Sequence, residues 1–374
     1  MYARAGVMGA ADLTIGRPDD VETARYQGQT ERNVDRTRRK VVFSTMATAM
    51  AATTGSVSRA AGGLTSPIAR RFKFAHVDVF TSQALSGNPL DVFLDARGMS
   101  DAEMLAVTRE TYLSEATFVF PRDAATERER GISVRIFTPE GEVPFAGHPT
   151  LGTAMVLRNL RLMSPLAHAS SPASLAEISL DLKVGKVPVT FMQDGSGRAF
   201  GEMRQVPPKF GAIHDKDTVA RLHNLTGDDI ADYAPIQTVS TGLPFAIVPL
   251  KRLSTLQSLR LDTQGMDAYV AKQEPHFGFY YVTRDTADST VGFRARCVYV
   301  GGEDAATGSA AGCAAGWMVR YGAAAPDQST HIRQGVEMNR TSDIFVRASR
   351  DGETIVNVRV GGNAVQTMEG ELLL

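Results

Sequence analysis

The chain has 374 residues, and its 40 basic and 41 acidic residues give a formal net charge of -1 at pH 7. This balance gives no basic footprint for nucleic acid. No apolar run reaches the roughly 18–20 residues that a membrane-spanning helix needs. Two cysteines cannot form a disulfide framework, and the seven histidines form no metal-binding motif. The length and composition predict a globular protein with two domains.

Residues 1–70 differ from the rest and are predicted to be a leader or a disordered extension. The segment 36–71 has no acidic residue and permits three interpretations. Thr37-Arg38-Arg39 before a weakly hydrophobic run is similar to a twin-arginine export signal, and 46–71 has the composition of an organelle transit peptide. We favour the third interpretation, in which the segment is an extension of a cytoplasmic protein and carries no targeting signal. Neither of the two signals has a convincing hydrophobic or amphipathic centre.

Regular patterns begin at Phe72. Ser100 and Glu103 have the spacing of a capping box, which predicts that a helix starts at Asp101. Alternation of apolar and polar residues predicts strands on both sides of it. The elements expected in this half are strands at 72–80, 91–96, 115–120 and 132–139, and helices at 101–112 and 150–160.

The second half shows a similar order of elements after a hairpin around a Gly-Ser-Gly turn at 195–197. The expected elements are hairpin strands at 175–193 and 198–207, strands within 239–250, short helices at 253–273, strands at 277–284 and 291–300, a small-residue helix at 309–322, and strands at 343–349 and 355–372. We interpret the repeated order as a diverged internal duplication, and the many hairpins predict a mixed sheet.

Two segments have the pattern of a strand that leads through glycine into a helix. In the first, Gly147-His148-Pro149-Thr150, the proline suits the first helical turn. In the second, Thr307 and Ser309 are candidate caps, and Gly308 permits close approach of a ligand to the backbone. Helix starts attract anions, so a substrate carboxylate is a candidate ligand. Two ordinary capped core helices are the alternative.

Other chemistry receives less support from the sequence. Ser309, His148 and Asp304 could nominally form a hydrolase triad, but the G-x-S-x-G pattern is absent. Cys297 and Cys313 lie in strand and alanine-rich surroundings, which predicts buried structural thiols. Glu115, at the mouth of a strand, would on sequence physics alone be an ordinary solvated carboxylate.

Five blocks together resemble the PhzF-like (phenazine-biosynthesis) family. They are DVFTSQALSGNPLDVFLDA, ETYLSEATFVF, IFTPEGEVPFAGHPTLGTA, VSTGLPFAIVPL and GGEDAATGSAAG, and the resemblance covers residues 72–374. It implies an α+β fold like that of diaminopimelate epimerase, with two pseudo-symmetric domains that each wrap a mixed sheet or barrel around a central helix. The expected boundaries are 71–197 and 198–360, with 361–374 as a terminal strand that returns to the first domain.

The resemblance also implies an isomerase that moves a carbon-bound proton on a small carboxylated, dihydro-hydroxyanthranilate-like substrate, without metal or cofactor, as a homodimer. By the matched motifs the expected catalytic residues are Glu115, His148 and Asp304, and the expected substrate-binding residues are Gly147, Thr307, Gly308 and Ser309. Burial in a cleft would raise the pKa of Glu115 toward neutrality, which suits a group that takes and returns a proton.

Three features bear on how far the resemblance extends. Tyr112 stands where the family usually has Asn, which would alter one pocket edge, and Ala305 stands where it usually has Pro. Cys297 and Cys313 lie outside the blocks, which disfavours racemisation by two thiols. An epimerase or racemase with a second base such as Asp304 remains an alternative, as does a non-catalytic ligand-binding protein of the same fold.

Overall fold

The computed structural model describes residues 69–163, 176–260, 263–273, 277–299 and 302–374. Almost all of the predicted leader therefore lies outside the described residues. Arg70 exchanges two backbone hydrogen bonds with Leu374, of 2.7 and 3.0 Å, so the fold includes two residues before Phe72. The division at 71–197 and 198–360 stays a prediction.

The elements of the first half agree well with the patterns in the sequence. They are β1 (Arg71–Val79), β2 (Asn88–Phe93), α1 (Asp101–Glu110), β3 (Ala116–Phe120), α2 (Ala124–Arg130), β4 (Ile132–Thr138), β5 (Gly141–Val143), α3 (Gly147–Met163), β6 (Glu177–Leu182), β7 (Gly185–Gln193) and β8 (Ala199–Arg204). The Ser100–Glu103 capping box is present at the start of α1, as predicted.

The second half contains the remaining elements. They are β9 (Lys209–Ile213), α5 (Lys216–Leu222), η2 (Gly227–Asp229), β10 (Gln237–Ser240), β11 (Pro244–Pro249), α6 (Leu253–Ser258), α7 (Thr263–Val270), β12 (Gly278–Arg284), β13 (Phe293–Tyr299), β14 (Gly302–Asp304), α8 (Gly308–Arg320), β15 (Thr330–Gln334), η3 (Val336–Met338), β16 (Ser342–Asp351), β17 (Thr354–Gly362) and β18 (Ala364–Leu373).

The pattern of strand pairing in the first half recurs in the second. β1–β2 is antiparallel, β2–β3 parallel and β3–β4 antiparallel; β4 then pairs with β5 antiparallel and with β6 parallel, and β6–β7–β8 is antiparallel. The same sequence of pairings runs through β10–β11–β12–β13, from β13 to β14 and β15, and through β15–β16–β17. This recurrence is what a duplicated chain would produce.

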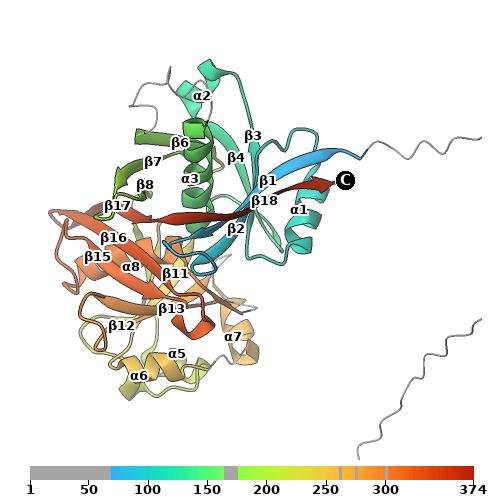
Figure 1. The fold of residues 1–374 in the computed structure, drawn as a ribbon. Coiled ribbons are helices and arrows are strands. Elements are labelled where there is room, and N and C mark those ends of the chain that lie inside the picture. The colour runs from blue at the N-terminus through green and yellow to red at the C-terminus, as the bar shows by residue number, and fades with distance from the viewer. Residues whose placement is uncertain (1–68, 164–175, 261–262, 274–276, 300–301) are drawn as a thin grey trace, which may run out of the picture. The chain divides into compact units, whose positions relative to one another are not determined.

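The described strands connect into one large mixed sheet. β8 pairs with β17, and β9 pairs with β10. The last strand, β18, returns to pair with β1 along its length, and the two lie side by side in Figure 1. The beginning and end of the described chain are therefore tied together by backbone hydrogen bonds.

Three predicted helices differ from the structure at their ends, and two helices were missed. The helix expected at 101–112 ends at Glu110. The helix expected from Thr150 begins at Gly147, because the Ala146 carbonyl already accepts from the Thr150 N–H. The helix expected at 309–322 spans Gly308–Arg320. The missed helices α2 and α5 have seven residues each and are capped by Asp123 and Asp215. They are too short for an apolar period to be recognised.

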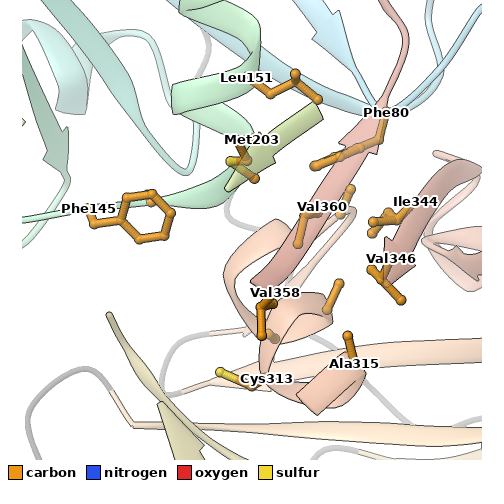
Figure 2. Close-up of a cluster of buried hydrophobic side chains, with 14 of the residues drawn as sticks. Phe80, Phe145, Leu151, Met203, Cys313, Ala315, Ile344, Val346, Val358 and Val360 are labelled. Carbon is orange, nitrogen blue, oxygen red and sulfur yellow. The ribbon is translucent and has the colours of Figure 1, made fainter. Parts of the chain in front are cut away.

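The central core joins both halves (Figure 2). Leu151 of α3 and Cys313 and Ala315 of α8 belong to one buried cluster with Val358 and Val360 of β17. Full burial of a side chain such as Leu151 stabilises the fold by roughly 2 kcal/mol. The small residues of α8 allow strands to approach it closely. No helix within the described ranges is both long enough and apolar enough to cross a bilayer.

Candidate active site

The starts of the two central helices lie against each other. A Cβ on Gly308 would lie 3.2 Å from the Cα of Gly147, and a Cβ on Gly147 would overlap the backbone nitrogen of Ser309. Only glycine fits at this contact. The first N–H groups of a helix have no intrahelical partner, so two sets of backbone donors and two positive dipole ends meet here. Both helix starts predicted from sequence thus contribute to one site.

Glu115 and His148 face each other beside this contact. Glu115 directly precedes β3, and His148 is the second residue of α3. Their Oε2 and Nε2 atoms are 3.8 Å apart, which is beyond hydrogen-bond distance. Both atoms are fully enclosed, and neither has a hydrogen-bond partner among the described residues. Such unsatisfied buried groups are costly, which is expected where a substrate makes the missing interactions.

Burial has opposite effects on these two groups. It raises the pKa of Glu115 to about 8, and the negative charge of Asp304 acts in the same direction. It lowers the pKa of His148 to about 3, so the imidazole is neutral at physiological pH. The side chain of Glu115 as a whole keeps 17% of its exposure, although its Oε2 atom is enclosed. Glu115 is therefore a carboxyl group that can carry a proton near neutral pH.

Asp304 is the second carboxyl group of the site, and its surroundings differ from those of Glu115. β14 pairs with β13 so that Asp304 lies opposite Cys297. Its Oδ1 accepts from the Asn88 side chain at 2.8 Å, and its Oδ2 accepts from the Thr307 hydroxyl at 2.7 Å. Burial raises the pKa of Asp304 to about 6, and these two hydrogen bonds hold it below that of Glu115. Two carboxyls with separated pKa values can serve as an acid and a base.

Asn88 is a site residue that the sequence analysis missed. Its Nδ2 lies 2.8 Å from Asp304 Oδ1, 2.9 Å from the Ala306 carbonyl and 3.1 Å from His148 Nδ1. The sequence analysis expected this strand to begin at Asp91, which left Asn88 outside it. Its place within the block DVFTSQALSGNPLDVFLDA was the available signal.

Three of the predicted substrate-binding residues have roles that differ in detail from the expectation. Thr307 occupies the N-cap position of α8 but makes no capping hydrogen bond, since its hydroxyl donates to Asp304 and its oxygen accepts from Gln334 Nε2 at 3.0 Å. Ser309 lies within the first turn of α8, so it is not the cap. Gly308 contacts Gly147 and Phe80, and its carbonyl accepts from Gln205 at 3.0 Å. The turn itself is braced by Gln334, which bonds the Asp304 carbonyl and Thr307.

Tyr112 has a backbone conformation that explains why Asn would suit this position. Its φ is +58°, and its side chain is 95% exposed. Asn and Gly adopt positive φ far more readily than Tyr. Ala305 is buried in the turn before α8.

The cysteines are buried, free thiols. Burial raises the pKa of Cys313 to about 11 and that of Cys297 well above its ordinary value. Both are therefore protonated at neutral pH, which makes them poor bases. Within the described residues no three His, Cys, Asp or Glu side chains gather as a metal site.

Comparison with known proteins identifies the family of the chain. Residues 77–370 match the family model described as phenazine biosynthesis-like protein. The chain is 32% identical over 306 residues to an uncharacterized isomerase of Mesorhizobium japonicum, covering 79% of this chain and 97% of that protein. It is 31% identical over 306 residues to trans-2,3-dihydro-3-hydroxyanthranilate isomerase of Pseudomonas aeruginosa, covering 81% and 99%.

Solved structures give the same relationship at the level of the fold. A PhzF-family phenazine biosynthesis protein of Bacillus anthracis superposes with a TM-score of 0.70 at 25% identity, covering 82% of this chain and all of that one. A hydroxyproline epimerase of Agrobacterium vitis superposes with a TM-score of 0.54 at 11% identity, covering 83% and 93%, which is a likeness of fold alone.

The fold and the site define a mixed α/β protein with a polar centre, made of two carboxyl groups and a histidine, at the meeting point of two helix starts. The family match extends over most of the chain and includes every residue of this centre. The chain belongs to the phenazine biosynthesis-like (PhzF) family and is an isomerase of that family.

Proposed function

We propose that this isomerase moves a carbon-bound proton on a small carboxylated substrate, with Glu115 as the general acid/base. The observation that carries the proposal is the pair of enclosed, unpartnered atoms, Glu115 Oε2 and His148 Nε2, 3.8 Å apart. A carboxyl group with a pKa near 8 is well matched to proton transfer at physiological pH.

The proposed reaction needs no net change in protons or electrons. The site gives one proton to a substrate carbon and takes one from another, so that one C–H bond forms, one breaks and the double bonds shift between them. Glu115 is returned to its starting state. Neutral His148 and ionised Asp304 orient the substrate, and the backbone donors at Gly147 and Gly308 bind its carboxylate and stabilise developing negative charge.

The substrate class follows from this arrangement and from the relatives. The helix starts at Gly147 and Gly308 favour a carboxylate. The bound substrate must then place a ring carbon within reach of the carboxyl oxygen of Glu115. A dihydro-hydroxyanthranilate carries both a carboxylate and a conjugated ring. Similarity to the Pseudomonas aeruginosa isomerase supports this class, and the substrate itself is part of the proposal.

We also propose that the two halves of the fold are pseudo-symmetric domains, with the site between them. The recurring order of strand pairings supports this, as does the matching position of α3 after the β4–β5 hairpin and of α8 after the β13–β14 hairpin. Each half then supplies one helix start and one carboxyl group.

An epimerase is the second candidate, and the presence of two carboxyls favours it. If Glu115 and Asp304 address opposite faces of one carbon, removal by one and return by the other inverts a stereocentre. Separated pKa values, one above and one below neutrality, suit that division of roles. The label position in one experiment distinguishes the two candidates.

The experiment is proton–deuterium exchange followed by NMR with the full chain in heavy water. The compounds are trans-2,3-dihydro-3-hydroxyanthranilate and a panel of small amino acids and cyclic carboxylates. Deuterium at a new ring position with a shifted double bond supports the isomerase, and deuterium at an inverted centre supports the epimerase. Glu115→Gln is expected to lower the exchange rate at least about 10²–10⁴-fold.

The matched control is Glu110→Gln, which alters an exposed carboxylate at the end of α1. It is expected to exchange at the wild-type rate. Wild-type exchange in Glu115→Gln would refute the role of Glu115. Ligand binding without exchange of any compound would favour the non-catalytic alternative.

A further inference from the structure

Asn88 connects groups that come from three separate places in the chain. It begins β2, whereas His148 is on α3 and Asp304 ends β14. Its side chain is 2% exposed, and one nitrogen reaches Asp304 Oδ1, the Ala306 carbonyl and His148 Nδ1. Two of these three neighbours, the carboxylate and the carbonyl, are pure acceptors. The amide must therefore present its NH₂ group, and not its oxygen, toward Asp304.

The position of Asn88 is itself held from the other half of the fold. The preceding residue, Gly87, donates its N–H to the Thr341 carbonyl at 3.0 Å, and its own carbonyl accepts from Arg340 Nε at 2.9 Å. Arg340 also bonds the buried Asp78 carboxylate at 2.6 Å. Gly87 has a φ of +70° and has no room for a Cβ, so the turn admits no easy alternative. The donor is thus aimed before any ligand binds.

The surroundings of Asp304 would otherwise favour its protonated form. Glu303, the residue before Asp304, is itself paired with Arg296 at 2.6–2.8 Å. The other ionisable side chains around Asp304 are Glu115 before β3, neutral His148 on α3, Cys297 and Tyr299 on β13, and Tyr280 on β12. None of these supplies a positive charge. Hydrogen bonds from the Thr307 hydroxyl, the Asn88 amide and the Ala305 backbone N–H favour the carboxylate.

We propose that Asn88 is a positioning residue that fixes Asp304 as a carboxylate against the start of α3, and so assigns the shared proton of the acid pair to Glu115. Asn88 acts through Asp304 and His148 and does not touch the reacting atoms. This inference rests on the proposed function, because it deepens the acid/base assignment of the same site. If Asn88 has this role, its hydrogen-bond donor helps to set the pH dependence of catalysis.

The experiment measures the protonation of Asp304 directly. The full chain is labelled with ¹³C at the carboxyl groups of Asp, and the Asp304 signal is assigned by its loss in Asp304→Asn. The carboxyl signals are then titrated in wild type, Asn88→Ala and Asn88→Asp. Loss of a charge-assisted donor is expected to move the Asp304 titration upward by about one pH unit in Asn88→Ala. A larger upward shift is expected in Asn88→Asp, where a second carboxylate replaces the donor.

Kinetics give a second measurement if a substrate turns over. An upward shift of one unit from a midpoint near 6 lowers the ionised fraction of Asp304 about fivefold at pH 6 and about twofold at pH 7. The acidic limb of kcat is therefore expected to move upward in Asn88→Ala. A fall in kcat that is equal at all pH values would indicate a merely structural role and would overturn the inference.

The matched control is Asn363→Ala. The Asn363 amide also donates to a carboxylate and a carbonyl, Asp194 Oδ2 at 3.1 Å and Ala199 O at 2.8 Å, in a different part of the chain. It is expected to leave the Asp304 titration unchanged. An Asp304 titration that is the same in wild type and in both Asn88 variants would refute the proposal. The titration needs no turnover, so this result is separate from a failure of the proposed isomerase activity. Asn88→Asp keeps the shape of the side chain if Asn88→Ala does not fold.

Discussion

Gly147 and Gly308 form a backbone-to-backbone contact in which neither residue has room for a side chain. A Cβ on Gly308 would lie 3.2 Å from the Gly147 Cα and 2.9 Å from the Phe80 ring. The contact joins the starts of α3 and α8, so residues 161 positions apart build one set of backbone donors. The site depends on this contact as much as on its carboxyl groups.

Gly147→Ala is expected to destabilise the protein by about 2–3 kcal/mol, because the new Cβ overlaps the backbone of Ser309, which cannot move aside as a flexible side chain could. Urea unfolding followed by circular dichroism measures the change. Gly195→Ala is the matched control, since a Cβ there meets nothing within 4 Å, and its stability should equal that of wild type. Equal stability of Gly147→Ala would mean that the helix starts are not in contact.

The pH dependence of turnover is expected to be bell-shaped, with limbs near pH 6 and pH 8. Burial raises the pKa values of Asp304 and Glu115 to about 6 and about 8, so the singly protonated pair is the main form between these values. Below pH 6 Asp304 loses its charge, and above pH 8 Glu115 loses its proton. A kcat–pH profile from pH 4.5 to 9.5 measures both limbs. If kcat instead rises through pH 8 to a plateau, Glu115 acts only as a base in its ionised form, and the singly protonated pair is not the active form.

Glu115→Gln is expected to stabilise the protein, and to do so more at pH 8 than at pH 5. The folded-state pKa of Glu115 lies above its ordinary value of 4.5, so the folded protein binds the proton more tightly and wild-type stability falls as the pH rises between 4.5 and 8. The difference between pH 5 and pH 8 should be at least about 1 kcal/mol. Urea unfolding at both values checks it. Glu353→Gln, in the exposed β16–β17 turn, should show no such difference.

Arg340→Met is expected to cost about 3 kcal/mol, because it leaves the Asp78 carboxylate buried without its cation. The double variant with Asp78→Asn should recover part of the loss, and a double-mutant cycle measures the coupling. The exposed Arg71–Glu371 pair is the comparison, with an expected coupling below about 1 kcal/mol. Similar coupling in the two pairs would contradict a special role for Arg340.

Tyr112→Asn is expected to stabilise the protein by about 0.5–1 kcal/mol, because Asn tolerates the positive φ at this residue and the exposed Tyr ring gives up little packing. Thermal unfolding measures the gain. Tyr112→Val places a β-branched side chain at the same φ and should destabilise. A gain in both variants would show that the ring, and not the backbone, is unfavourable.

The sequence by itself determined the local elements and the family blocks. The alternation at 72–80, the Ser100–Glu103 capping box and the glycine-led helix starts each depend on a few neighbouring residues, whose preferences act locally. The order of blocks then indicated the family, and the family match covers residues 77–370. The ends of helices were predicted less accurately than their presence, as the start of α3 at Gly147 shows. The helices α2 and α5 are too short to show a recognisable apolar period in the sequence.

Only the tertiary structure decided which of these residues meet. Sequence physics alone made Glu115 an ordinary solvated carboxylate, and only the family resemblance marked it as catalytic. Its raised pKa follows from burial that no local pattern encodes, with its Oε2 enclosed opposite His148. Asn88 and Asp304 are 216 positions apart, and their hydrogen bond exists because β1–β18, β8–β17 and β9–β10 pairings join the two halves. Local preferences specify elements, whereas desolvation and long-range pairing, which act only after the chain has folded, specify the chemistry of the site.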